Sequence, residues 1–298
     1  MPGSYFGPFS AAAETDAEPA GGNTGRWPNG HYLITPDGRK YQYTLNDGTV
    51  EVAGNLYQSV TLVADHQNVA ANVARAIGAV VISASLGATV AGVDIYNEGV
   101  IHINDVGGEG YVYRVRRARA VADGHASAAA STVLTANLEA DSSVQVALAT
   151  TSEMSFTRNR FREVLIHPGP PTARLAGVSP GVAAADRYYW SQVQGEAAIL
   201  ADGTLLQGLP VQASITIDGA VESHKRRITT SGTSVASPNY SVHDSGGASI
   251  AVGVSGGATA TSYDITGGIS VNAPLVGICV QTNASTEYAL IDVLYLGS

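Results

Sequence analysis

The stretch from Val164 to Ser223 constrains the fold more than any other part of the chain. Apolar and polar residues alternate there in short runs, and proline, glycine or an Asp-Gly pair interrupts each run. This period of two is typical of β-strands, in which successive side chains point to opposite faces. At its centre, Tyr188, Tyr189 and Trp190 form the densest aromatic cluster of the chain. The alternation predicts that Tyr189 faces one side of a strand and that Tyr188 and Trp190 face the other.

Asp-Gly dipeptides recur along the chain as turn signals. Between two alternating runs, Asp-Gly is a strong short-range signal for a β-hairpin, because its residues readily adopt positive φ. Many short strands separated by such turns predict an all-β fold of the sandwich or barrel kind, and no helices alternate with the strands as in an α/β sheet. The five dipeptides are Asp37-Gly38, Asp47-Gly48, Asp123-Gly124, Asp202-Gly203 and Asp218-Gly219.

One segment departs from this pattern and predicts a single short helix. Val69, Val73 and Ile77 recur every four residues, Asp65 precedes them as a possible cap, and Gly78 follows them as a helix end. Such a short amphipathic helix is expected to lie on a sheet or across an opening.

Composition divides the chain into three predicted regions. Residues 1–30 are rich in Gly, Ala and Pro, so we expect an extended N-terminal arm. This arm either becomes ordered against a partner or is a flexible terminus. Residues 31–122 are expected to form an N-terminal β-rich domain, and residues 123–298 a C-terminal β-sandwich or barrel. Small residues from Asp123 to Ala130 mark the expected boundary. A Gly- and Ser-rich segment at 232–257 predicts a mobile loop or a surface hairpin.

Charge argues against a role in wrapping nucleic acid. The formal net charge is −9, whereas nucleic-acid binding calls for a basic face. Only 14% of the residues are charged, so burial in an assembly is one way for such a chain to remain in solution. The single cysteine, Cys279, lies in an apolar run and is expected to be a buried small hydrophobe. The sequence predicts no signal peptide and no membrane span.

Three basic clusters are candidates for docking onto an acidic surface, since arginine is favoured in protein interfaces. Ion pairs within the chain, with its 25 acidic residues, are the alternative interpretation. The aromatic cluster is a further interface candidate, or a platform for sugar binding. The candidate interface residues are Arg114, Arg116, Arg117, Arg119, Arg158, Arg160, Arg162, Tyr188, Trp190, Arg226 and Arg227.

No pattern in the sequence predicts a catalytic, metal or cofactor site. Asp94, Glu98, Asp105 and Glu109 form the densest acidic group, but they lack the tight spacing of a calcium loop and are expected to be solvated hairpin ends. The seven histidines are scattered, and the sequence contains no HExxH motif, G-x-S-x-G elbow or P-loop. We therefore expect no enzyme activity and no cofactor.

Several runs resemble structural virion proteins of tailed bacteriophages, of the kind that decorate or cement the capsid. The similarity covers roughly residues 55–298 and is carried by packing and turn patterns. The runs most alike are Gly-Glu-Gly-Tyr-x-Tyr at 108–113, Ala-Gly-Val at 176–178, Tyr-Tyr-Trp-x-Gln-Val-x-Gly at 188–195, and Val-Gly-Ile at 276–278.

This resemblance implies a β-rich protein on the outer capsid surface, often a homotrimer, that bridges neighbouring copies of the major capsid protein without contacting nucleic acid or a membrane. Two alternatives remain open at this point. The first is a tail, fibre or spike component that binds a host glycan, with residues 188–190 as the platform. The second is a polysaccharide depolymerase, which would need a pair of essential carboxylates such as Glu98 and Glu109.

Overall fold

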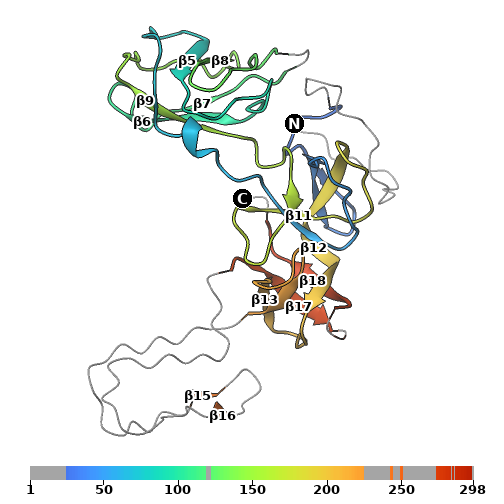
Figure 1. Cartoon of the computed structure of the whole chain (residues 1–298). Helices are drawn as coiled ribbons and strands as arrows, with labels where there is room; N and C mark the ends of the chain where they lie inside the picture. Colours follow the sequence, from blue (N-terminus) through green and yellow to red (C-terminus); the bar gives the residue numbers. More distant parts are fainter. Residues whose placement is uncertain are drawn as a thin grey trace, which may run out of the picture.

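A computed structural model describes residues 25–118, 122–224, 242–243, 249–250, 273–282, 284 and 286–296. These residues form β-strands and a single 3₁₀ turn, which confirms the expected all-β class. The strands gather into two bodies, each with its own hydrophobic core, and two chain segments connect them (Figure 1).

The larger body is built on a ten-stranded sheet in the order β10-β3-β11-β12-β14-β13-β17-β18, to which β1 and β2 are joined through β12. Its strands are β1 (Tyr32–Ile34), β2 (Lys40–Leu45), β3 (Leu56–Gln58), β10 (Leu165–Ile166), β11 (Leu175–Val178), β12 (Tyr188–Asp202), β13 (Pro210–Ala213), β14 (Val221–Ser223), β17 (Leu275–Gln281) and β18 (Tyr288–Val293).

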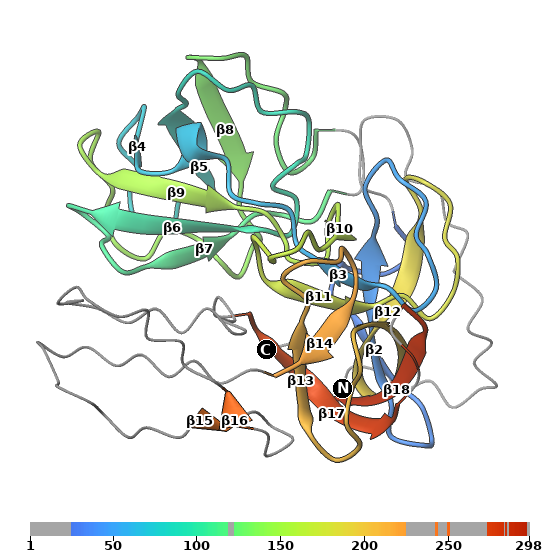
Figure 2. The ribbon, with the colours of Figure 1, turned by 60° about the horizontal axis from the view of Figure 1, so that its bottom comes forward.

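The 15-residue strand β12 organises this body. Its first half pairs with β2 and its second half with β18, both antiparallel. The change of partner follows a register shift between Gln192 and Gln194, and Gly195 has a φ of 88°. An irregularity of this kind bends and twists a strand. Because β18 pairs with both β17 and β12, the strands β12, β14, β13, β17 and β18 close into a small barrel (Figure 2).

The smaller body is inserted into the chain between β3 and β10. It contains a four-stranded sheet, a two-stranded sheet and a hydrophobic core that runs from Val69 to Phe156. Its elements are the 3₁₀ turn η1 (Ala64–His66) and the strands β4 (Val69–Ala70), β5 (Val81–Ser85), β6 (Val100–Asp105), β7 (Val112–Arg114), β8 (Val133–Asn137) and β9 (Glu153–Thr157). Outside both bodies, β15 (Val242–His243) pairs with β16 (Ser249–Ile250) within the segment expected to form a loop or hairpin.

The helix expected after Asp65 is wrong. The chain makes only the turn η1 there, and Val69 lies in strand β4. Val73 and Ile77 are 45% and 70% exposed, so their spacing of four does not reflect one buried helical face. Backbone bridges across the body, such as Arg75 to Leu148, satisfy this segment in place of helical hydrogen bonds.

The expected boundary at residues 123–130 does not separate two domains. Bridges join His125 to Ala136 and Ala128 to Ala91, and both alanines at this second bridge belong to the core of the smaller body. The division at 122/123 therefore falls inside one hydrophobic core. The actual arrangement is an insertion, which composition does not reveal because both bodies have the same kind of sequence.

Asp-Gly dipeptides mark turns, but few of them join neighbouring strands. Asp37-Gly38 closes the β1–β2 hairpin, and Asp218-Gly219 lies in the connection between the paired strands β13 and β14. Each of the other three lies in a connection between consecutive strands that do not pair with each other. Of the expected N-terminal arm, residues 1–24 lie outside the described residues, and residues 25–30 pack against the chain's own larger body, where the Gly30 N–H donates to the Tyr43 carbonyl.

Gly177, on β11, has a positive φ and packs closely against β12. Gly38 also has a positive φ and provides a matched control. Gly177 has a φ of 132°, and a Cβ there would lie 2.7 Å from the Gln192 carbonyl oxygen. Gly38 has a φ of 87° but open space around it. We expect Gly177→Ala to lower the free energy of unfolding by about 3 kcal/mol and Gly38→Ala by about 1 kcal/mol, because only the first adds a backbone clash to the strain. Urea denaturation checks this, and equal losses would contradict it.

Candidate functional site

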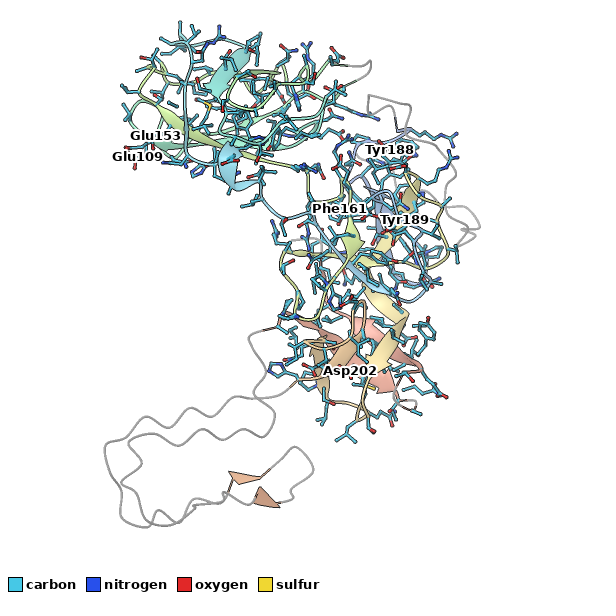
Figure 3. All side chains as sticks on the ribbon, viewed as in Figure 1. Glu109, Glu153, Phe161, Tyr188, Tyr189 and Asp202 are labelled. Carbon is cyan, nitrogen blue, oxygen red and sulfur yellow. The ribbon has the colours of Figure 1, made fainter. Side chains whose placement is uncertain are left out.

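The junction between the two bodies holds a cavity of about 540 Å³. Its lining comes from both connecting segments, 59–63 and 157–161, and from the neighbouring loops at 29–30, 96–100 and 172–174. Figure 3 places Phe161 at this junction, between the smaller body, where Glu109 and Glu153 lie, and the aromatic pair Tyr188 and Tyr189. Pockets of this size accommodate small ligands or short peptide segments.

The basic cluster of Arg158, Arg160 and Arg162 lies at this junction, where most of its contacts hold the chain's own structure together. Arg158 pairs with Glu163, and Arg162, only 3% exposed, lies 3.4 Å from the same carboxylate. The Nε of Arg160 donates to the Leu175 carbonyl at 2.8 Å, and its Nη2 donates to the Leu175 and Leu296 carbonyls. Burial, and secondarily the charge of Arg174, lower the pKa of Arg160 to about 10. The expectation that Arg162 is available for docking is therefore wrong, because its side chain is buried.

The basic cluster of Arg114, Arg116, Arg117 and Arg119 lies partly on the surface and partly at the junction, as far as the structure describes it. Arg114 is exposed on β7, and the Nη1 of Arg116 lies 3.8 Å from Asp123. Arg117 reaches across to residue 25: its Nη2 donates to the Gly25 carbonyl at 2.6 Å, and its Nε lies 3.3 Å from Glu98. Arg119, Arg226 and Arg227 lie outside the described residues.

Two members of the acidic group are buried, contrary to the expectation of solvated hairpin ends. Glu98 accepts hydrogen bonds from the backbone N–H and the side-chain amide of Asn29, both at 2.9 Å, which ties residue 29 to the smaller body. Burial raises the pKa of Glu98, while Asn29 and Arg117 oppose that rise. Asp94 accepts from the N–H groups of residues 122, 124 and 125 and so closes a loop. Asp105 and Glu109 are exposed, as expected.

The aromatic cluster is mostly core. Tyr189 joins the main core, whereas Tyr188 and Trp190 join a separate small cluster with Tyr43, which confirms that they face opposite sides of β12. Tyr188 is 0% exposed and stacks on Tyr43 with ring centroids 4.9 Å apart. Trp190 is half-buried beside His31. The rings of residues 188 and 189 are thus not available as a sugar platform or interface.

The sequence reasoning missed an apolar outer face on the barrel. Register places Leu200 opposite Tyr288, Ala198 opposite Leu290, and Ile278 opposite Pro210. Tyr288 and Ile278 are each 42% exposed. We call the outward side chains of these strands the outer barrel face: Ala198, Leu200, Pro210, Ile278, Tyr288 and Leu290.

The outer barrel face also carries two acids in direct opposition. Glu196 on β12 faces Asp292 on β18, and both are exposed. Like charges directly opposite in a sheet are unfavourable unless a cation lies between them. A signal for this face existed in the sequence: the runs LVGICVQ and YALIDV are apolar at both parities, which indicates strands that bury both faces.

Within the described ranges, no group of three or more His, Cys, Asp or Glu residues is placed to hold a metal ion. No helix in this part of the chain is long and apolar enough to cross a membrane. Cys279 is buried in the barrel core, as expected. No family model, curated protein or solved structure matches the chain.

One buried acid is not explained by any ion pair in the described residues. Glu51 is 1% exposed and forms a backbone bridge with Ala183. Neither of its carboxyl oxygens has a hydrogen-bond partner of ordinary geometry. The Tyr57 phenol is close enough to favour the charged form, but burial dominates and raises the pKa of Glu51 to about 8 from 4.5.

Glu51 predicts a loss of stability as the pH rises. Between pH 4.5 and about 8, the folded protein holds a proton that the unfolded chain releases, so this contribution is complete at low pH and is lost as the pH rises through the folded pKa. We expect Glu51→Gln to raise the free energy of unfolding at pH 8 by on the order of 4 kcal/mol and to leave it nearly unchanged at pH 4.5. Urea denaturation at both pH values checks this, with the exposed Glu109→Gln as control.

Proposed function

We propose that this chain is a structural virion protein that decorates the outer surface of a bacteriophage capsid and bridges neighbouring shell subunits. The observation that carries the proposal is the outer barrel face, where β12, β18, β17 and β13 present apolar side chains outward. A sheet face of this kind is stabilised when another surface covers it. The resemblance of residues 55–298 to decoration proteins points to the same role.

The chemistry of the outer barrel face specifies the partner further. Ile278 and Tyr288 supply apolar area, and the opposed carboxylates of Glu196 and Asp292 favour a basic side chain on the partner. The partner in this proposal is the major capsid protein, with an apolar patch and an Arg or Lys at its centre. The proposal requires no catalysis and no cofactor.

Repetition of one weak contact over many copies explains how a small docking surface can strengthen a shell. A decoration protein repeats one contact over many capsid positions, so the combined stabilisation exceeds the affinity of each contact. The resemblance implies a homotrimer, in which three linked copies hold three shell sites at once. A mass of three times 30.5 kDa, measured by light scattering on the purified chain, would support this state.

The glycan-binding alternative loses its proposed platform. Tyr188 and Tyr189 are 0% and 1% exposed, so two of the three rings cannot stack on a sugar without unfolding part of the body.

The depolymerase alternative requires a pair of essential carboxylates such as Glu98 and Glu109. Glu98 is engaged by Asn29 and Arg117 in a buried contact, while Glu109 is exposed on the smaller body (Figure 3).

Copy number distinguishes these roles. We expect purified native particles to contain this chain in a ratio comparable to the major shell protein, because decoration follows the shell lattice. Quantitative mass spectrometry measures the ratio. A few copies per particle would move the assignment to a tail or spike, and absence from the particle would end the structural proposal.

A substitution on the outer barrel face tests the docking surface itself. We expect Ile278→Asp to weaken binding to undecorated capsids by at least about tenfold, since it puts a charge into a desolvated contact beside Asp292. Val90→Asp, on the smaller body at 61% exposure, is the matched control and should bind normally. Co-sedimentation checks both. Equal binding by the two variants would show that another face docks.

A further inference from the structure

His125 is buried in the smaller body with both of its ring nitrogens engaged. It is 1% exposed, and its backbone forms a bridge with Ala136. Its Nε2 accepts a hydrogen bond from the backbone N–H of Tyr96 at 3.0 Å, and its Nδ1 lies 2.9 Å from the carbonyl oxygen of Ala126. A backbone N–H can only donate and a carbonyl can only accept, so the proton of the neutral ring is on Nδ1. These two contacts fit the neutral imidazole alone.

A second proton on the His125 ring has no acceptor. Protonation places an N–H on Nε2, directly opposite the backbone N–H of Tyr96. The hydrogen bond between them is then lost, and two donors face each other inside the body. A buried donor without an acceptor is costly, and a buried charge costs more. Protonation of His125 therefore favours a conformation in which water reaches this ring.

The surroundings of His125 disfavour its charged form. Burial is the largest effect on the pKa of His125 and lowers it. The charges of Arg162 and His66 lower it further, whereas the Ala126 carbonyl and the Asp94 carboxylate oppose this change. Because the folded pKa lies below the value of 6.5 expected for an unfolded chain, the stability that the neutral ring contributes is complete above that pH and is lost as the pH falls.

His66 also contacts Tyr96 but has a different kind of partner. Its Nε2 lies 2.9 Å from the carbonyl oxygen of Thr89, so this nitrogen carries the proton, and its Nδ1 contacts the Tyr96 hydroxyl. A hydroxyl can accept as well as donate, so a second proton on His66 still finds an acceptor. His102, the other histidine of the smaller body, is exposed on β6, where water solvates it. His125 is therefore the one whose protonation is opposed by a fixed donor.

We propose that His125 is an acid sensor, whose protonation opens the smaller body while the larger body stays folded. The larger body responds to acid in the opposite direction, because the buried Glu51 holds a proton at low pH that the unfolded chain releases. Opening at Tyr96 also affects the junction, since Glu98, two residues further along the chain, contacts Asn29. The inference goes beyond the proposed decoration role and does not depend on it.

Hydrogen exchange of the full-length chain tests this proposal, with each rate divided by that of the unfolded chain at the same pH. Between pH 7.5 and 5.5, we expect protection in the smaller body to fall by about tenfold, because one unit below 6.5 the opened chain binds a proton that the closed body excludes. Peptides from β12 in the larger body should keep their protection.

Two matched variants separate His125 from its neighbour. The amide of His125→Gln can accept from Tyr96 but does not titrate, so we expect its smaller body to be protected almost equally at the two pH values. His66→Gln removes the other buried histidine beside Tyr96 and should retain the wild-type loss of protection. An equal effect of the two variants would overturn the assignment to His125.

A measurement on the wild-type chain covers the case in which His125→Gln does not fold. In nuclear magnetic resonance spectra of the folded chain with isotope-labelled histidine, the ring of His125 should remain neutral at pH 5.5, with its proton on Nδ1. A charged His125 ring in the folded state would overturn the proposal. Unchanged protection of the smaller body at pH 5.5, or equal loss from both bodies, would also overturn it.

Discussion

The larger body is held together by strand β12, whose first half is buried on both faces. On one face, Tyr189, Val193 and Ile199 enter the main core, and on the other Tyr188 and Trp190 pack with Tyr43. The strand therefore cannot shift its register without exposing two sets of apolar side chains. Because its two halves pair with β2 and β18, this one strand also holds the barrel and the flanking strands in a single unit.

Polar contacts help to attach the smaller body to the larger one. Glu98 joins Asn29 and Arg117, and Arg158 and Arg162 share Glu163, close to the points where the chain enters and leaves the insertion. Buried charges of this kind are costly unless paired, and removing one partner leaves the other exposed to that cost. They favour one defined arrangement of the junction over alternatives, since few other arrangements satisfy the same groups.

Two surfaces of different chemistry follow from this architecture. The outer barrel face is apolar with two opposed acids, whereas the lining of the cavity between the bodies includes Arg158, Arg160, Arg174 and Glu98. An apolar face supplies binding free energy, and charged groups add selectivity. In the proposed decoration role, the outer barrel face would hold the chain on the shell.

The all-β class and the opposite orientation of Tyr188 and Tyr189 could be predicted from the sequence, because alternation is a local property of an extended chain. The insertion, the absence of a helix after Asp65 and the burial of Arg162 could not be predicted in this way. The spacing of Val69, Val73 and Ile77 is compatible with a helix, and only bridges to distant residues exclude it. The environment of an arginine likewise depends on which remote segments meet it. Local periodicity fixes which way side chains point, whereas tertiary structure decides what they meet.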